Sequence, residues 1–380
     1  MGVRPDVSVV IPVYNSKAFL DCLINSVLGQ TLTNIEIICV DDGSTDGSGD
    51  ILRYFADSDH RIQIIEKENG GEGSARNAGL RHAAGEYVCF FDSDDFVDRN
   101  MLEEMVSCAR ANTSDLVICA IDAYYEESDT YKPNEWAVSR EAVPVGVAFD
   151  PLKIEDLFRH IVGYAANKLY RTSFVLDNDL LFQEIRTHGD LSFSYAGLAA
   201  AKRVVYIDTP FYHHRIRKGS LSDTTQESHW HCLFEALDNL RSELYRLDIW
   251  SECERDFANY VLQMAKWKFS RVGGQVRVDL DEGLRSEWFP HLGVLTYPKD
   301  FFYNKDCLAF LEDTMSLPYM DRQEKELERL RLLIADQDVI LANLDYECDQ
   351  ITMSASYKIG HALLRPFWLL KRAFSVHRGR

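Results

Sequence analysis

Short apolar runs alternate with amphipathic stretches over the first 120 residues of the chain. The runs are rich in Val and Ile and almost continuously apolar, which is typical of strands buried on both faces of a sheet. They cover Val7–Val13, Ile35–Val40, Ile62–Glu66, Glu86–Phe91 and Leu116–Ile121. The stretches between them predict helices over Lys17–Leu28, Gly47–Ala56, Gly73–Ala84 and Asn100–Arg110. This order predicts an α/β fold with a mostly parallel central sheet and helices on both faces.

The pattern changes after residue 121. The predicted elements are then irregular strands and loops over 122–149, mixed α/β structure over 151–217 and helices over 226–311. Within the mixed segment, Arg203–Ile207 and Phe211–Ile216 predict a pair of strands. We therefore expect one α/β domain over residues 1–222 and a helical region over residues 223–320.

A heptad-like repeat follows the helical region and predicts a coiled-coil-like helix over residues 321–352. The spacing of its members alternates between three and four, and only Gln337 among them is polar. The members are Leu327, Leu330, Ile334, Gln337, Leu341, Leu344, Cys348 and Ile351. Such a repeat fits a homo-oligomer formed through residues 327–351. It fits equally a long helix that packs on its own domain, because the repeat barely reaches the length of a coiled coil.

The composition narrows the cellular setting. Apolar residues make up 46% of the 380 residues, and no run of 18 apolar residues occurs, so we expect a substantial core and no transmembrane helix. The first residues lack the pattern of a secretion signal. The nine cysteines are scattered, without a Cys-x-x-Cys pair, which indicates a reducing compartment. We expect a cytoplasmic protein.

The charge is unevenly distributed along the chain. The net charge of −19 excludes a general nucleic-acid binder, which needs a basic surface. Residues 351–380 nevertheless contain six Lys or Arg and no acid, interleaved with Leu, Phe and Trp. Residues 353–380 therefore predict a basic amphipathic tail that binds an anionic membrane, here the inner face of the plasma membrane. Docking of the tail on the acidic body of the same protein is the alternative.

Polar residues follow three of the predicted strands at the point where each strand ends. They lie in Pro12–Asn15, Asp41–Asp46 and Asp92–Asp95. Such residues are common in any turn, but ligands of parallel sheets bind at the carboxyl ends of the strands, where the three loops would meet. In an extended segment Asp92 and Asp94 share a face, and two close carboxylates repel each other unless a cation lies between them. Oxygen ligands favour Mg²⁺ or Mn²⁺, completed by substrate phosphates and water.

Four ordered segments within about 90 residues resemble the signatures of the family 2 glycosyltransferases, of the bacterial polysaccharide type. They are Val7–Asn15, Val40–Gly47, Asn69–Gly79 and Phe91–Asp95. Weaker similarity continues to about Ser222. The resemblance implies the GT-A fold, with a nucleotide-sugar half over residues 1–120 and an acceptor half over residues 121–222.

The resemblance also implies individual roles in binding the nucleotide sugar. Tyr14, in the loop that begins at Pro12, would stack on the base, and Asp42 would accept the imide hydrogen of a uracil base. Arg76 would lie near the base or the diphosphate. The other implied residues are Asp92 at the ribose or metal, Ser93 beside it, Asp94 as direct metal ligand, and Arg215 and Ser220 closing over the diphosphate.

A catalytic base is implied in the second half of the domain. The segment His188–Phe193 resembles a family pattern in which a Glu-Asp pair precedes a helix, and Asp190 matches the base. Gly189 stands where the family usually has the glutamate. Asp190 would otherwise be only the N-cap of the helix that follows it.

The implied function is an inverting transfer of a sugar from a nucleotide-diphosphate donor, UDP by preference, to an acceptor hydroxyl. A glycan or lipid-linked acceptor is expected, in the assembly of cell-surface polysaccharide or glycolipid. Two alternatives remain open. A nucleotidyltransferase would carry a glycine-rich basic loop after the first strand, whereas this chain has Val13–Ser16 there. A catalytically silent nucleotide-sugar-binding scaffold is favoured only by Gly189.

Overall fold

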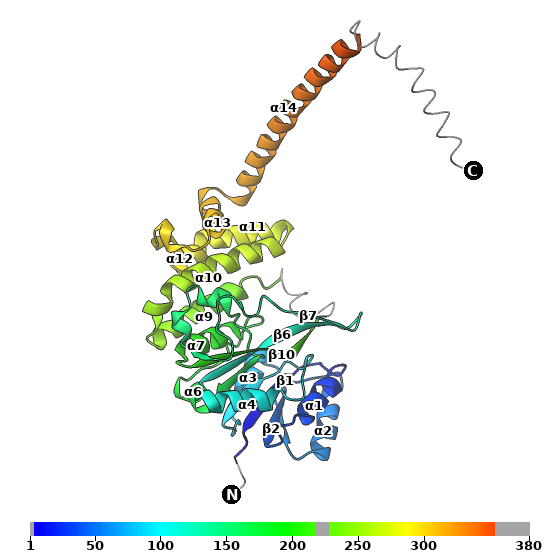
Figure 1. Cartoon of the computed structure of the whole chain (residues 1–380), viewed down its shortest axis with the longest axis vertical. Coiled ribbons are helices and arrows are strands. Elements are labelled where there is room, and N and C mark those ends of the chain that lie inside the picture. Colours follow the sequence, from blue (N-terminus) through cyan, green and yellow to red (C-terminus); the bar gives the residue numbers. More distant parts are fainter. Residues whose placement is uncertain (1–3, 217–227, 354–380) are drawn as a thin grey trace, which may run out of the picture. The chain divides into compact units, whose positions relative to one another are not determined.

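The computed structural model describes residues 4–216 and 228–353 of the chain (Figure 1). These residues form two compact units, which divide between Ser316 and Leu317 and are described separately. Ser220 and residues 354–380, which make up nearly all of the predicted basic tail, lie outside the described residues.

The first unit is built on a ten-stranded sheet with the strand order β3-β2-β1-β4-β9-β6-β10-β5, to which β7 and β8 are added. The strands are β1 (Val7–Val13), β2 (Ile35–Asp41), β3 (Ile62–Glu66), β4 (Tyr87–Phe90), β5 (Phe96–Val97), β6 (Leu116–Tyr125), β7 (Thr130–Pro133), β8 (Ala148–Phe149), β9 (Lys168–Arg171) and β10 (Val204–Ile216). Strands β1 to β4 run parallel, as do β6 and β10, while β9 runs antiparallel between β4 and β6. The predicted α/β fold with a mostly parallel sheet is confirmed.

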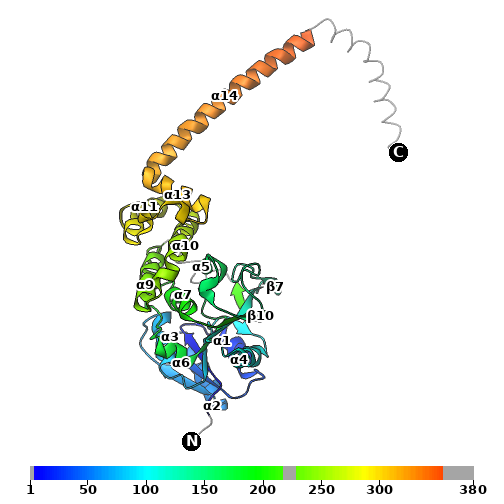
Figure 2. The ribbon, with the colours of Figure 1, turned by 60° about the vertical axis from the view of Figure 1, so that its left-hand side comes forward.

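Helices connect the strands and cover both faces of the sheet (Figures 1 and 2). Those of the sheet region are α1 (Leu20–Leu28), α2 (Ser48–Ser58), α3 (Glu72–Leu80), α4 (Met101–Asn112), α5 (Leu157–His160), α6 (Thr172–Asp177) and α7 (Leu191–Ala200). The five strands and four helices predicted for the first 120 residues all occur, with bounds that differ by a few residues.

The continuous apolar character of the strands follows from two cores, one on each face of the sheet. Val9 and Ile11 of β1 belong to a buried cluster that also contains residues of α1 and α4. Val10, between them, belongs to a second cluster with residues of α3 and α7. Because successive side chains of a strand point to opposite faces, a strand between two cores is apolar at nearly every position.

The predicted pair of strands over residues 203–216 is wrong, because the structure has one long strand there. β10 runs from Val204 to Ile216 and pairs in parallel with β6 along its length. The register shifts between Ile207 and Pro210 and again between Pro210 and Tyr212. Proline cannot donate to the ladder, so it interrupts the pairing as a bulge without ending the strand.

The helical region predicted after the sheet is confirmed. Its helices are α9 (Cys232–Arg246), α10 (Trp250–Arg271), α11 (Gly274–Gly283), α12 (Phe289–His291) and α13 (Lys305–Ser316), with short π- and 3₁₀-helical turns between them. α9 packs against α7 (Figure 2), so the helices share the core on one face of the sheet. Asp256 of α10 accepts the backbone N–H groups of Asp156 and Leu157, at 3.1 and 2.8 Å, and so joins α10 to α5.

The second unit is dominated by a single helix, α14 (Tyr319–Met353), which agrees with the helix predicted over residues 321–352. Whether it forms a coiled coil stays a prediction. Among the described residues, no helix has both the length and the apolar character needed to cross a membrane.

Candidate active site

The loops that follow β1, β2 and β4 meet at the carboxyl edge of the sheet, as the sequence predicts. Asn15 lies in the left-handed backbone region with φ of 50°, and its side-chain oxygen accepts the N–H of Thr45 at 2.8 Å. The hydroxyls of Ser16 and Ser93 lie 2.6 Å apart and join the first loop to the acidic loop. Ser93 therefore has its place at the junction of two strand-end loops.

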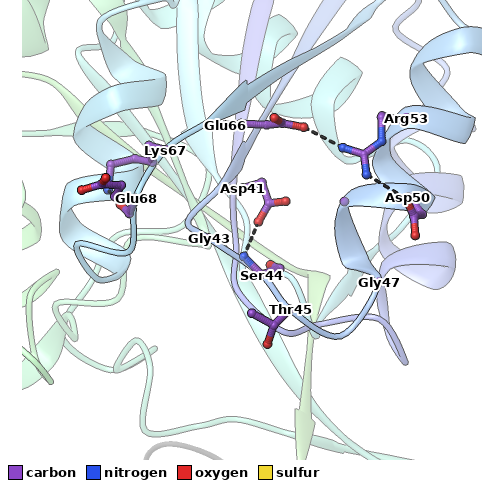
Figure 3. Close-up of a pocket in the computed structure, with 11 residues that line it drawn as sticks. Asp41, Gly43, Ser44, Thr45, Gly47, Asp50, Arg53, Glu66, Lys67 and Glu68 are labelled. Carbon is purple, nitrogen blue, oxygen red and sulfur yellow. Dashed lines mark hydrogen bonds and ion pairs between the residues drawn. The ribbon is translucent and has the colours of Figure 1, made fainter.

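An open pocket lies where β2 and β3 end (Figure 3). Its residues are Asp41, Gly43, Ser44, Thr45, Gly47, Gly49, Asp50, Arg53, Glu66, Lys67 and Glu68. Arg53 bridges Asp50 and Glu66, each at 2.7 Å, on one side of the pocket. In the neighbouring loop after β1, Pro12 is buried, whereas Tyr14 is 49% exposed and accessible to a planar ligand.

Asp42 lies buried beside this pocket and holds the chain that leads into α3. Its carboxylate accepts hydrogen bonds from Lys67 Nζ at 2.6 Å, from the N–H of Gly70 at 3.0 Å and from the N–H of Gly71 at 2.8 Å. The residue is only 2% exposed. The structure therefore shows an anchoring role for Asp42, and its contact with a uracil base stays a prediction.

The acidic loop after β4 is tied to α3 through Arg76, which is almost completely buried. The guanidinium of Arg76 pairs with Asp92 at 2.5 Å and with Glu72 at 2.6 Å, and it lies over the ring of Phe182 at 5.1 Å. Asp92 also accepts the hydroxyl of Tyr164 at 2.8 Å. Arg76 thus lies between two carboxylates, of which only Asp92 belongs to the predicted site.

Asp95 is the buried anchor of the acidic loop. It accepts the hydroxyl of Tyr212 at 2.7 Å and the N–H of Arg215 at 2.8 Å, and it lies 3.3 Å from His214 Nδ1. Burial raises the pKa of Asp95, and the neighbouring His214 opposes this shift. Burial disfavours the charged form of His214, but its contact with Asp95 prevails and raises the pKa of the imidazole.

Asp94 is partly exposed at the tip of the same loop, and its backbone carbonyl accepts Arg215 Nε at 2.8 Å. The guanidinium of Arg215 also pairs with Glu126 at 2.8 Å and lies 5.3–5.4 Å from the rings of Phe19, Phe96 and Tyr124. Arg215 therefore fixes the loop that presents Asp94. Its predicted contact with a diphosphate stays a prediction.

Asp190 lies at the N-terminus of α7 and faces the acidic loop. Burial raises the pKa of its carboxyl, Asp92 adds to this shift, and Arg76 and Lys168 oppose it. The side chain makes no capping hydrogen bond to α7, although the residue occupies the N-cap position. The interpretation of Asp190 as only a helix cap is therefore not supported.

Glu72 completes a cluster of four carboxylates around Arg76. Burial raises the pKa of Glu72 to about 7, Arg76 opposes this, and the charges of Asp92, Asp190 and Asp94 raise it further. These mutual effects place the acidic loop, the start of α3 and the start of α7 around one cleft. The sequence analysis did not single out Glu72. Its position inside the glycine-rich segment Asn69–Gly79 was the only signal available.

Gly189, which replaces the glutamate expected from the resemblance, has a packing reason. A Cβ atom at Gly189 would lie 2.5 Å from the carbonyl oxygen of Gln183, and a Cβ atom at Gly73 would lie 2.3 Å from the same oxygen. The N–H of Gln183 also donates to the carbonyl of Gly189 at 3.0 Å. Two glycines thus let the Gln183 backbone fit between α3 and α7, which brings Arg76 and Asp190 together.

Two further residues were missed by the sequence analysis because their roles depend on contacts across the fold. Lys168 is buried and donates to the carbonyl oxygens of Val162 at 3.0 Å and Tyr164 at 2.5 Å, and to Asn167 Oδ1 at 3.0 Å. Burial lowers the pKa of Lys168 to about 7, and the nearby Asp190 opposes this shift. Lys168 therefore fixes the backbone of Tyr164, whose hydroxyl holds Asp92.

The chain resembles known glycosyltransferases along most of its length. The model of the family "Glycosyl transferase family 2" matches residues 8–175. Glycosyltransferase GlyG from Streptococcus pneumoniae is 32% identical over 233 residues, which cover 59% of this chain and 75% of that protein. The cholesterol galactosyltransferase of Borreliella burgdorferi is 31% identical over 263 residues, covering 68% and 72%.

Other relatives share less of their length or only the fold. Bacillus subtilis EpsH is 36% identical over 236 residues, or 61% of this chain, and the chain spans just under two thirds of EpsH, 66%. A crystal structure of residues 1–349 of Staphylococcus aureus TarS superimposes with a TM-score of 0.53 at 20% identity. The match covers 79% of this chain and 93% of TarS and shows a common fold. With three polar strand-end loops around one carboxylate cleft and relatives of this length and identity, the chain belongs to glycosyl transferase family 2.

Proposed function

We propose that the protein transfers a sugar from a nucleotide-diphosphate donor, UDP by preference, to an acceptor hydroxyl with inversion at the anomeric carbon. The observation that carries this proposal is the carboxylate cluster around Arg76, in which Asp190 and the acidic loop Asp92–Asp95 share one cleft. A preference for UDP is supported by TarS, which was crystallised with UDP and with UDP-GlcNAc.

Asp190 is the group suited to act as the general base. Burial raises its pKa, so its carboxylate is a stronger base than an exposed aspartate, while Arg76 and Lys168 help to keep it ionised. It takes the proton of the acceptor hydroxyl as that oxygen bonds to the anomeric carbon. The bond from this carbon to the diphosphate breaks on the opposite side, and the nucleoside diphosphate leaves with the electron pair.

The leaving diphosphate gains negative charge, which the site must offset. Arg76 is held in place by Glu72 and Asp92 and supplies a fixed positive charge at the cleft. Within the described residues, no group of three or more His, Cys, Asp or Glu side chains is arranged to hold a metal. Asp92 and Asp94 nevertheless fit a Mg²⁺ or Mn²⁺ ion bound through one or two carboxylates and the phosphates of the donor. Such an ion would act as a Lewis acid on the diphosphate.

The proposed acceptor is a glycan or a lipid-linked glycan in cell-surface assembly. The named relatives include the cholesterol galactosyltransferase and the poly(ribitol-phosphate) β-N-acetylglucosaminyltransferase TarS, so both lipid and polymer acceptors occur among them. Binding of the basic tail, residues 353–380, to an anionic membrane would place the enzyme next to such an acceptor. The close packing at Gly189 removes the only feature that favoured a catalytically silent scaffold.

The test separates donor binding from transfer in the full chain. UDP-sugars are screened with Mg²⁺ or Mn²⁺ for UDP release, and binding of UDP is measured by calorimetry. Asp190→Asn should bind UDP like the wild type but lose about 10²- to 10⁴-fold in turnover, because only the base is removed. Asp94→Asn should weaken UDP binding and depend more strongly on the metal concentration.

Asp208→Asn is the matched control, since Asp208 contacts Tyr206 and Arg140 instead of the cleft. It should leave binding and turnover unchanged. Transfer at the wild-type rate by Asp190→Asn would refute the assignment of the base. A wild-type chain that neither binds nor hydrolyses any UDP-sugar would refute the proposed donor.

A further inference from the structure

Helix α14 carries a row of apolar side chains that the second unit leaves exposed. The 35-residue helix is about 52 Å long at 1.5 Å per residue. Leu327, Leu330, Ile334, Leu341 and Leu344 are each 44–59% exposed, although all are large and aliphatic. A row of exposed aliphatic side chains of this length on a soluble helix marks an interaction surface.

The spacing of these residues selects the kind of partner. They recur at intervals that alternate between three and four residues from Leu327 to Ile351, about three and a half heptads, with Gln337 as the single polar member. This is the core of a helical coiled coil, whose complement is another helix with the same repeat. A second copy of α14 satisfies this requirement.

The charges along α14 decide how two copies would lie. Residues 319–331 carry four basic and four acidic side chains, whereas residues 332–353 carry five acids and no Lys or Arg. A parallel pair would place the two acidic halves side by side, and like charges at that distance repel. An antiparallel pair places each acidic half beside the half that contains Arg322, Lys325, Arg329 and Arg331.

The heptad positions are compatible with this orientation. If the two repeats overlap completely and run in opposite directions, Ile334 of one copy lies opposite Leu344 of the other, and Gln337 lies opposite Leu341. Every core layer then pairs a first with a fourth heptad position, and the two polar Gln337 side chains each face an aliphatic partner near the centre. We infer that α14 joins two copies of this chain through an antiparallel coiled coil.

The first experiment measures the mass of the full chain in solution by light scattering. The wild type should be a dimer, and Leu330→Asp should be a monomer with an unchanged melting temperature of the first unit. Leu332→Asp is the matched control, because Leu332 is 65% exposed but lies outside the repeat, two residues along the helix from Leu330. It should remain a dimer. A monomeric wild type, or equal dissociation by both variants, would overturn the inference.

The second experiment determines the orientation by disulfide cross-linking. Ile334→Cys and Leu344→Cys are made separately in a chain in which Cys22 and Cys348 are replaced by serine. Neither variant should cross-link with itself, whereas an equimolar mixture of the two, unfolded and refolded together, should give a disulfide-linked dimer. Cross-linking of either variant alone would show a parallel pair and contradict the antiparallel arrangement.

Discussion

Replacing Tyr164 by phenylalanine should impair the acidic loop without disturbing the packing around it. The hydroxyl of Tyr164 lies 2.8 Å from one oxygen of Asp92 and 3.3 Å from one oxygen of Asp95. The ring packs edge-on against Tyr212 at 6.1 Å and His214 at 5.9 Å, and phenylalanine keeps these contacts. The substitution therefore removes one hydrogen-bond donor from two carboxylates.

The size of the effect follows from the hydrogen bond that is lost. A hydrogen bond to a charged group contributes about 1.5–3 kcal/mol. The bond to Asp92 at 2.8 Å is well formed, and that to Asp95 at 3.3 Å is longer, so one full bond is the appropriate estimate. If its free energy keeps Asp92 in the geometry that binds the donor, kcat/KM for the nucleotide sugar should fall about 10- to 100-fold.

The assay is steady-state release of UDP as a function of donor and of Mn²⁺ concentration. We expect KM for the donor and the Mn²⁺ concentration for half-maximal activity to rise more than kcat falls, because Asp190 is untouched. Tyr206→Phe is the control, since Tyr206 donates to Asp208 at 2.9 Å away from the cleft. The reasoning fails if Tyr164→Phe has wild-type kinetics at limiting Mn²⁺, or if Tyr206→Phe reproduces its effect.

Two other properties can be tested with the same protein. Gly189→Ala should lower the free energy of unfolding by about 1–3 kcal/mol, because the new methyl group would overlap the carbonyl of Gln183. Gly273→Ala is the thermal-melting control, as nothing lies within 4 Å of that Cβ position, and similar melting of both variants would contradict the packing argument. In the pH profile of kcat, activity should be lost on acidification at a pH above the ordinary aspartate pKa of about 3.9, because burial raises the pKa of Asp190 and only its carboxylate accepts a proton. Lys168→Met removes a charge that lowers this pKa, so its acid limb should move to higher pH, and a shift to lower pH would contradict this electrostatic role.

Much of the fold was predictable because the strands lie between two cores. Val9 and Ile11 face one core and Val10 faces the other, so the strand appears in the sequence as an uninterrupted apolar run. The polar loop after each run then predicts which edge of the sheet binds ligands. The long strand β10 was not predictable, because Pro210 within it is typical of a break between strands, and only pairing with β6 carries the strand across this position.

The candidate site was predictable as far as its residues lie in local patterns. Asp92, Asp94 and Asp190 follow or precede predicted elements, and motif resemblance identified them. Tyr164 lies in no such pattern, since its hydroxyl reaches Asp92 only because β9 pairs beside β4.

The sequence by itself determined the α/β order, the three polar loops, the acidic pair Asp92–Asp94 and the heptad spacing of α14, because each depends on residues close together in the chain. Tertiary structure alone decided that Arg76 lies among four carboxylates and that Gly189 fits against Gln183. Those contacts join segments about 15 to 120 residues apart. Burial then sets the pKa values of Glu72 and Asp190, and burial is a property of the folded chain that no local pattern contains.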